Sequence, residues 1–355
     1  MARGKGFQGI VGVKKGAAWG TAVAAGAGNG VYALSLDTPG DTELVEDRTL
    51  TGKITTKPSL AGNRTIDVTF VANLVYEGLE PLIAFLMGTA GAPSTVDTSG
   101  KQHVLKPKDD LDGIFATLAY EILKDTTVVE ITSVKWHSLR LRGKPGQPIE
   151  IEMQGIGYDY NAASATNTTT TIDTVTYPTP REVAMYSHGV WDMNAQTGAD
   201  FGGTDLLYVT DWEVAVERAL DRIVSTKHGN KTEEPIGSDF LKVTGTWTFP
   251  VLQDGTGGNS GLMADQMALT AKKARLVLTG ATLIGAATQY NQIKIWLPYV
   301  QLGAGKPSIG GPGAVSYVVP WESHHVAAIP TGFTTGYTDA ITMDIFSTRA
   351  TDALA

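Results

Sequence analysis

The stretch RTIDVTFVANLVYEGLEPLIAFLMGT, from Arg64 to Thr89, changes its hydrophobic period half-way along. Its first part alternates apolar and polar side chains, which is the pattern of a half-buried β-strand. The apolar face of that strand carries Ile66, Val68, Phe70, Ala72, Leu74 and Tyr76. The second part has a helical period, with apolar residues at Leu79, Leu82, Ile83, Leu86 and Met87. Pro81 in the first turn and Gly88 after the last turn are typical helix boundaries, so we expect a strand followed by a short helix.

A second strand-and-helix pattern lies about half a chain later. LKVTGTWTFPV, Leu241 to Val251, alternates in the same way, and SGLMADQMALT, Ser260 to Thr270, has a helical period with Ser260 as the expected N-cap. The expected buried stripe of this helix is Leu262, Met263, Met267 and Leu269. Further landmarks recur in the same order: Asp47-Arg48 with Asp221-Arg222, Tyr32 with Tyr208, and Gly143-Lys144-Pro145 with Gly305-Lys306-Pro307. Such ordered self-similarity predicts an internal duplication.

The composition favours sheets over helices. The 355-residue chain is 42% hydrophobic, which suffices for ordinary cores, and it contains 41 glycines together with many threonines and valines. Turn signals separate short alternating segments along most of the sequence. We therefore predict a mainly β protein made of two tandem β-sandwich or barrel units, each with one short flanking α-helix.

The chain divides into four predicted parts. Residues 1–30 are too rich in Gly and Ala to form a core, so we expect an extended N-terminal arm, anchored by Trp19, that becomes ordered only against a neighbour. Residues 31–160 form the first unit, and residues 206–355 form the second. Between them, residues 161–205 are a Thr- and Gly-rich linker or outward decoration.

Three positions predict irregular strands. The alternation of the segment from Val128 to Gly143 slips between Ile131 and Val134, which indicates a bulge or break. Pro298 and Pro320 lie in or at the ends of strand patterns, where proline is tolerated only at edges or bulges.

Charge and cysteine content exclude several classes of protein. The chain has no cysteine, and therefore no disulfide framework or thiolate chemistry. It has no segment long and apolar enough for a signal peptide or a membrane span, so we expect a soluble protein that stays in the cytosol after synthesis. The net charge of −8 argues against a surface that grips nucleic acid, because phosphate binding requires clustered Lys and Arg.

No pattern of catalytic or metal-binding residues is present, so we predict no enzyme activity, no cofactor and no metal. His324-His325 is the one histidine pair, and adjacent strand residues point to opposite faces, which prevents a shared metal. Glu150 and Glu152 lie two residues apart on one strand, and the ordinary interpretation of such a pair is a solvated sheet face.

The N-terminal segment from Gly12 to Ala22 consists of a glycine, six residues and then Trp-Gly-Thr-Ala. It precedes a short strand, a long polar loop, the strand-and-helix pattern and paired long strands. In this order the chain resembles the major tail tube proteins of long-tailed bacteriophages, closely over the first unit and more loosely over the second. The resemblance implies tail-tube-like units that assemble into rings, which stack into a hollow tube through which DNA passes.

The resemblance also implies two sets of functional residues. The polar faces of the long strands would line the lumen, with candidates Asp67, Thr69, Glu150, Glu152, Thr244 and Thr246. Contacts between stacked rings would come from the arm and the loop from Asp37 to Gly62, with candidates Trp19, Asp47, Arg48, Asp221 and Arg222. A mildly acidic lumen would let DNA slide past without binding it.

Tail tube proteins of this type usually carry one unit per chain in six-fold rings. Two units per chain would close a ring with three chains, so we favour a trimer with a pseudo-six-fold lumen, with a hexamer as the alternative. The implied partners are copies of the chain itself, the tape measure, tail terminator and tail tip proteins, and DNA in transient, non-specific passage, with no membrane. The implied location is the virion tail, after synthesis in the host cytoplasm.

Two other functions remain open from the sequence. A carbohydrate-binding or adhesin-like double β-sandwich would use surface aromatics such as Trp136, Trp212 and Trp321 as its binding platform. A hydrolase with an unrecognised site is the other. Rings or tubes in negative-stain electron microscopy would distinguish the tail tube protein from both.

Overall fold

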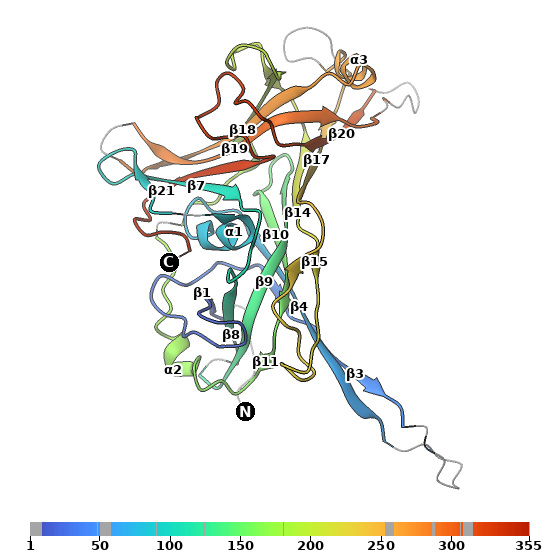
Figure 1. Cartoon of the computed structure of the whole chain (residues 1–355). Coiled ribbons are helices and arrows are strands. Elements are labelled where there is room, and N and C mark those ends of the chain that lie inside the picture. Colours follow the sequence, from blue (N-terminus) through green and yellow to red (C-terminus); the bar gives the residue numbers. More distant parts are fainter. Residues whose placement is uncertain are drawn as a thin grey trace.

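The computed structural model describes residues 9–354 except 48, 50–57, 90, 124, 180, 253–258, 286–287, 306 and 308–314. The described chain is mainly β, as predicted from composition (Figure 1). Within these residues, 19 strands belong to one continuous sheet and two more form a small separate ribbon. None of the helices in the described part is long and apolar enough to cross a membrane.

The stretch from Arg64 to Thr89 folds as its sequence predicts. It contains most of strand β4, Leu60–Asn73, and helix α1, Glu80–Met87. A proline occupies the first turn of α1, and Gly88 ends the helix with φ 80°, a left-handed conformation that glycine adopts without steric cost. α1 is buried on nearly every side rather than along one stripe, because it lies between β7 (Lys101–Pro107) and β9 (Thr127–Gly143).

Six strands of the first half follow one another by hydrogen-bonded pairing. Their spatial order is β1 (Val11–Lys15), β8 (Ala116–Leu123), β9, β10 (Glu150–Gly157), β4 and β2 (Ser35–Asp37). Every pair is antiparallel. α1 follows β4 along the chain and packs on one face of this set.

Six strands of the second half have the same spatial order. They are β12 (Gly189–Ala195), β18 (Lys272–Leu283), β19 (Tyr290–Leu302), β20 (Tyr317–Ser323), β17 (Lys242–Phe249) and β14 (Asp211–Glu217). Helix α3, Leu262–Met267, follows β17 as α1 follows β4. The two halves therefore match strand for strand in order and direction.

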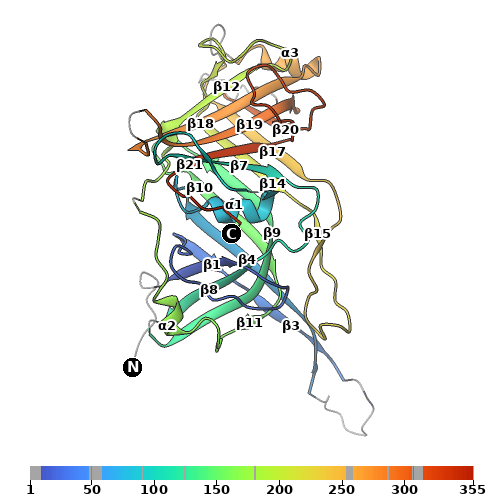
Figure 2. The ribbon, with the colours of Figure 1, turned by 60° about the vertical axis from the view of Figure 1, so that its left-hand side comes forward.

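The two halves are joined in two places. β14 pairs with the end of β9 from Ser138 to Gly143, so the sheets of the two halves are continuous. The C-terminal strand β21, Thr342–Ser347, lies between β19 of the second half and β7 of the first. In Figures 1 and 2 the second half lies at one end of the molecule, and β9 extends toward it from the N-terminal half.

Short elements complete the described chain. They are β3 (Gly40–Val45), β5 (Gly88–Thr89), β6 (Ser94–Thr95), β11 (Tyr160–Asn161), α2 (Thr169–Ile172), the 3₁₀ turn Tyr186–His188, β13 (Leu206–Leu207), β15 (Leu220–Asp221) and β16 (Ile236–Gly237). β3 and the first part of β4 form a hairpin that projects from the body of the molecule in both views (Figures 1 and 2).

The strand irregularities occur at the positions predicted from the sequence. The register of β8 against β9 shifts between Ile131 and Val134, and β9 continues through the bulge. The register of β18 against β19 shifts around Pro298. Pro320 lies in β20 just before its pairing with β19 begins, where its missing N–H breaks no ladder on that side.

The N-terminal segment differs from the expected free arm. β1 pairs along β8 from Val11 to Lys15, and Ala25 and Val31 are buried against the same chain. The segment 9–30 is therefore part of the first half. The Gly- and Ala-rich composition did not indicate this packing. Gly12 and Gly30 lie so close to residues 172–177 that a larger side chain would not fit, which is why small residues occur there.

The expected linker and second helix also differ from the sequence patterns. Residues 161–205 contain β12, a paired strand of the second half, and residues 174–178 lie against the first half, where the Gly30 N–H donates to the Thr176 carbonyl at 3.1 Å. In α3 only Leu262 is buried, whereas Met263 and Met267 are exposed, and Leu269 after the helix is exposed too. The N-cap of α3 is Gly261 rather than Ser260.

Four tryptophans form the centre of the joined core. Trp191, Trp212, Trp247 and Trp321 contact one another with ring centroids 5.2 to 6.5 Å apart. All four are at most 3% exposed. Trp136 is fully buried as well, so the aromatic platform expected for a carbohydrate-binding protein is wrong: Trp136, Trp212 and Trp321 are core residues.

Candidate functional site

A mostly polar face runs across both halves of the sheet. Residues directly opposite each other on antiparallel strands lie on the same face, so the registers define three rows that cross β4, β10, β9, β14, β17 and β20. We call this set the polar face. Its members are Thr69, Val71 and Asn73; Glu150, Glu152 and Gln154; Ser138, Arg140 and Arg142; Glu213, Ala215 and Glu217; Lys242, Thr244 and Thr246; and Pro320 and Glu322.

The opposite face of the same strands is apolar and buried. Alternate residues such as Phe70, Met153, Leu139, Val216 and Val243 belong to one hydrophobic cluster with α1 and the tryptophans. The period of two along each strand thus separates a dry face from a polar one over six strands. The charged side chains in the middle of the polar face are partly exposed, from 20% for Glu152 to 42% for Glu150.

The structure brings five of the six predicted lumen residues together on the polar face. They are Thr69, Glu150, Glu152, Thr244 and Thr246. Asp67 lies on the same side of β4 beyond the end of the three rows, where Arg222 forms an ion pair with it.

Two arginines that the sequence interpretation passed over lie in the middle of the polar face. Arg142 contacts Glu150 and Glu152 at 3.5 Å each and Glu213 at 3.0 Å, and Arg140 contacts Glu213 at 3.3 Å. The alternation of Leu139 and Leu141 with these arginines was the signal that could have found them. The face is consequently a network of paired charges rather than a purely acidic and hydroxyl-bearing wall.

A histidine lies at the edge of the polar face. His137 occupies the position where the register of β9 against β10 shifts, and its carbonyl accepts the Arg218 N–H at 2.8 Å. Burial lowers the pKa of His137, and the nearby Asp67 carboxylate opposes part of that shift. The residue therefore favours its neutral form more than a solvated histidine does.

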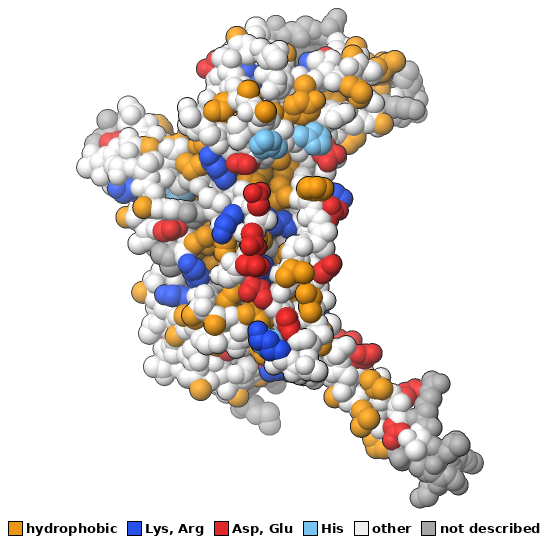
Figure 3. All heavy atoms as spheres, viewed as in Figure 1, with side chains coloured by type: hydrophobic (Ala, Val, Ile, Leu, Met, Phe, Trp, Pro, Cys, Tyr) orange, Lys and Arg blue, Asp and Glu red, His pale blue; other side chains and the backbone are white. Residues whose placement is uncertain are grey.

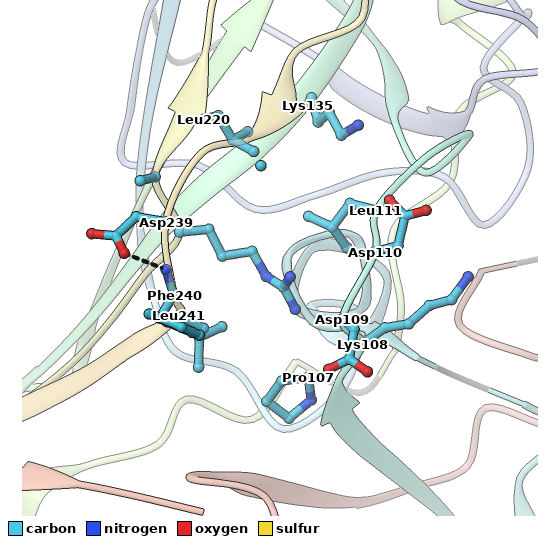
Figure 4. Close-up of a pocket in the computed structure, with 13 residues that line it drawn as sticks. Pro107, Lys108, Asp109, Asp110, Leu111, Lys135, Leu220, Asp239, Phe240 and Leu241 are labelled. Atoms are coloured by element: carbon cyan, nitrogen blue, oxygen red, sulfur yellow. Dashed lines mark hydrogen bonds between the residues drawn. The ribbon is translucent and has the colours of Figure 1, made fainter.

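A cavity of about 390 Å³ lies between the loop after β7 and the segment around β15 and β16 (Figure 4). Its described lining includes the buried Lys135 and the half-buried Arg218 but no serine, cysteine or histidine. Lys135 contacts Glu234 at 2.9 Å, and the Arg218 guanidinium donates to the Met87 carbonyl at 3.2 Å. Burial lowers the pKa of Arg218, opposed by Asp109 and Asp110. These two contacts hold the segment after β14 against the first half.

Carboxylates also gather in two arrangements that the described residues show. On the face seen in Figure 3, acidic side chains form a column down the middle of the molecule with basic side chains beside it. Elsewhere, carboxylate oxygens of Glu121, Asp125 and Asp173 lie within 4.8 Å of one another. Oxygen ligands of this kind suit a hard cation, but surface acidic groups commonly lie this close without one.

The family model for phage tail tube proteins matches residues 6–323. The chain belongs to the phage tail tube protein family. No curated protein matches the sequence. As a tail tube protein, the chain is a structural component of the virion tail that assembles with copies of itself and with other tail proteins. The matched range, residues 6–323, includes all twelve strands of the two six-strand sets. The family model therefore covers both halves of the chain rather than one of them.

The predicted ring-stacking residues of this tail tube protein are scattered. Trp19 packs edge-on against Phe115 and Tyr158, and its indole N–H donates to the Thr232 carbonyl at 3.0 Å, so it anchors two parts of one chain. Asp221 lies in β15, and Arg222 pairs with Asp67.

The first-half landmark corresponding to Asp221-Arg222 is Asp47-Arg48. The Asp47 carboxylate accepts the Thr49 N–H at 3.0 Å near the end of the projecting hairpin, and Arg48 lies outside the described residues. The two members of this landmark pair thus lie in segments that follow matching strands, β2 and β14. Their role in stacking remains a prediction.

Proposed function

We propose that three copies of this tail tube protein close a ring whose lumen is lined by the polar face, and that stacked rings form the DNA-conducting tube of a long-tailed phage. The observation that carries the proposal is the junction of β9 with β14, where the strand at the edge of the second set pairs with the end of β9, the third strand of the first set. Repeating that junction between chains closes a sheet with six sets from three chains. Closure also removes open sheet edges, which otherwise pair indiscriminately.

The junction between chains follows from the strand correspondence. β14 corresponds to β2, and β9 corresponds to β19, so β2 of one chain would pair with the end of β19 in its neighbour. Among the described strands β2 pairs with β4 alone. Beyond Val300, β19 has β20 on one side and no described strand on the other. Both edges are available for a further antiparallel pair.

The exposure of Leu34 supports this assignment. Ser35 of β2 pairs with Val71 on the polar face, so the preceding residue Leu34 lies on the apolar face, as Val214 does in the corresponding strand β14. Val214 is 1% exposed at the β9 junction, whereas Leu34 is 58% exposed. Pairing with a neighbour would bury Leu34 as the internal junction buries Val214, a gain of roughly 1.5–3 kcal/mol per chain for a fully buried leucine.

The charge of the polar face suits the passage of DNA. The three rows contain five carboxylates and three cations, which leaves two net negative charges per chain. Arg140 and Arg142 are held by glutamates of neighbouring strands, so their charges are already neutralised when phosphate passes. Lys242, the third cation, contacts Asp239 at 3.8 Å. A wall whose described cations all have carboxylate partners releases few counterions from DNA and does not retain it.

The number of chains per ring tests the proposal. Rings dissociated from tubes and weighed by native mass spectrometry are expected to contain three chains. Images averaged without imposed symmetry are expected to be three-fold outside and close to six-fold inside. Six chains per ring would contradict the proposal, since each chain would then contribute a single set of strands to the lumen. The ends of the tube would contact the tape measure, terminator and tip proteins.

A further inference from the structure

The segment between β14 and β17, residues 218–241, crosses from the second half onto the first. We call it the clamp loop. Its backbone is held to the first half at its start, where the Arg218 N–H donates to the His137 carbonyl at 2.8 Å, and further along, where the Arg64 N–H donates to the Asn230 carbonyl at 2.7 Å and the Trp19 indole donates to the Thr232 carbonyl at 3.0 Å. Its side chains reach the first half as well: Glu234 contacts Lys135 and accepts the Gly113 N–H at 2.8 Å, and Lys231 contacts Asp159 at 2.6 Å.

The clamp loop crosses the same junction that β14 makes with β9. It leaves the sheet at Glu217, the β14 residue paired with Ser138, and continues along the first half beyond that pair. The side chain of Lys135 is only 1% exposed beneath it. The second half is thus fastened to the first twice, by the paired strand β14 and by the loop that follows it.

The hairpin of β3 and β4 has the same place in the first half. It leaves β2 and returns into β4, as the clamp loop leaves β14 and returns into β17. Both segments contain a two-stranded ribbon, β15 with β16 in the clamp loop and β3 with β4 in the hairpin. The hairpin, however, projects away from its own chain (Figures 1 and 2).

The projecting hairpin exposes large apolar side chains. Leu44 is 71% exposed, Leu60 is 61% exposed and Val45 is 47% exposed. An isolated two-stranded hairpin is only marginally stable in water, and exposed apolar groups on an extended ribbon mark a surface that another molecule covers. The covering surface must be apolar in part.

We propose that the β3–β4 hairpin is the clamp between chains: it crosses the junction to the adjacent copy in the same ring and lies along that copy's second half. This rests on the three-chain ring proposed above. It differs from the contact between stacked rings that the family resemblance implies for the loop from Asp37 to Gly62. All six junctions of the ring are then held in the same way, by the segment that follows the junction strand. Three of these junctions lie within chains and three lie between chains.

The second half offers an apolar stretch close to the corresponding place. Tyr158 and Asp159, which the clamp loop contacts, follow directly after β10. His324 and His325 follow directly after β20, the counterpart of β10, and the exposed residues Ala327, Ala328 and Ile329 come next after the buried Val326. Ile329 is 38% exposed. The ionic contacts to Asp159 within a chain are replaced between chains by Leu44 and Leu60 against this stretch.

Photo-crosslinking distinguishes a contact within the ring from one between rings. A photoreactive amino acid replaces Leu60 in one preparation and Leu44 in another, tubes are verified by electron microscopy, and the irradiated chains are separated under denaturing conditions. A contact within the ring links each chain to the next around a closed set, so the ladder stops at three chains. Peptide mapping is expected to find the partner residues in the second half, around Ala327–Ile329.

A reciprocal variant controls for chance proximity. The same photoreactive residue at Ile329 is expected to link back to the hairpin and again to stop at three chains. Crosslinked products of more than three chains, from tubes built of three-chain rings, would contradict the proposed role of the hairpin. They would not contradict the three-chain ring. Rings of six chains would overturn the ring and the clamp together.

Discussion

Two glycines determine how closely the strands of the joined core approach. Gly143 lies opposite Trp212 and Gly245 opposite Trp321, and a Cβ atom at either position would overlap the indole ring. At Gly245 it would also overlap the Glu213 carbonyl oxygen, which is backbone and cannot rotate away. The flat indoles lie across the glycines and form the tryptophan cluster. Neither glycine has a positive φ, so their requirement is space rather than backbone conformation.

Gly245→Ala is therefore expected to lower the free energy of unfolding by about 1–3 kcal/mol, the usual cost of overpacking a core. Chemical denaturation of the isolated chain measures it. Gly203→Ala is the matched control, since a Cβ at Gly203 has no atom within 4 Å. Equal stability of the two variants would show that the core relaxes around the added methyl group.

His137 makes stability depend on pH. Because burial lowers its pKa in the folded state, the unfolded chain takes up the proton first as the pH falls below the usual histidine value of about 6.5. Acidification from there down to the folded-state pKa favours unfolding. His137→Gln is expected to lose less stability than the parent chain between pH 7.5 and 5.5, measured as the shift of the urea midpoint. His325→Gln, at an exposed position, is the substitution control. A parental slope in His137→Gln would contradict this.

At the scale of elements, sequence patterns predicted which segments form but not which faces become covered. β4 and α1 follow their periods and boundary residues closely. α3 has a similar period, yet Met267 is 79% exposed because burial depends on neighbours far away in the sequence. β1 was missed for a related reason: its partner β8 lies about 100 residues later, and small residues give little periodic signal.

The junction strand β2 yields a prediction about assembly. Leu34→Asp is expected to leave the chain folded, because substitutions of exposed side chains usually change stability by less than about 0.5 kcal/mol. It should nevertheless prevent ring formation, since a carboxylate would be buried where Val214 packs at the internal junction. Size-exclusion chromatography and circular dichroism measure the two properties. Leu283→Asp, at a leucine 48% exposed near the end of β18, is the control and should still form rings.

For the whole molecule, the sequence indicated two matched halves and a polar strand face but not that one sheet joins them. The recurrence of Tyr32 at Tyr208 follows the strand order, whereas the pairing of β9 with β14 depends on edges that carry no sequence signature. The charge balance of the polar face was likewise hidden. Arg140 and Arg142 lie in β9, for which the sequence pattern indicated only a bulge. Their glutamate partners lie in β10 and β14, 8 to 73 residues away along the chain.

If the polar face lines the lumen as proposed, its charge balance predicts how mutations there affect the passage of DNA. Glu150→Lys with Glu152→Lys would leave Arg142 with one of its three carboxylate partners and add two cations per chain, which turns the polar face from net negative to net positive. Phage carrying the double variant should assemble normally and release DNA more slowly, measured as dye fluorescence after triggering. The delay should shrink as salt rises, because phosphate attraction is screened.

Glu150→Gln with Glu152→Gln should give a smaller delay, since it removes charge without adding cations. A delay that does not respond to salt would indicate a distorted lumen instead, and unchanged release would mean that the polar face does not meet DNA.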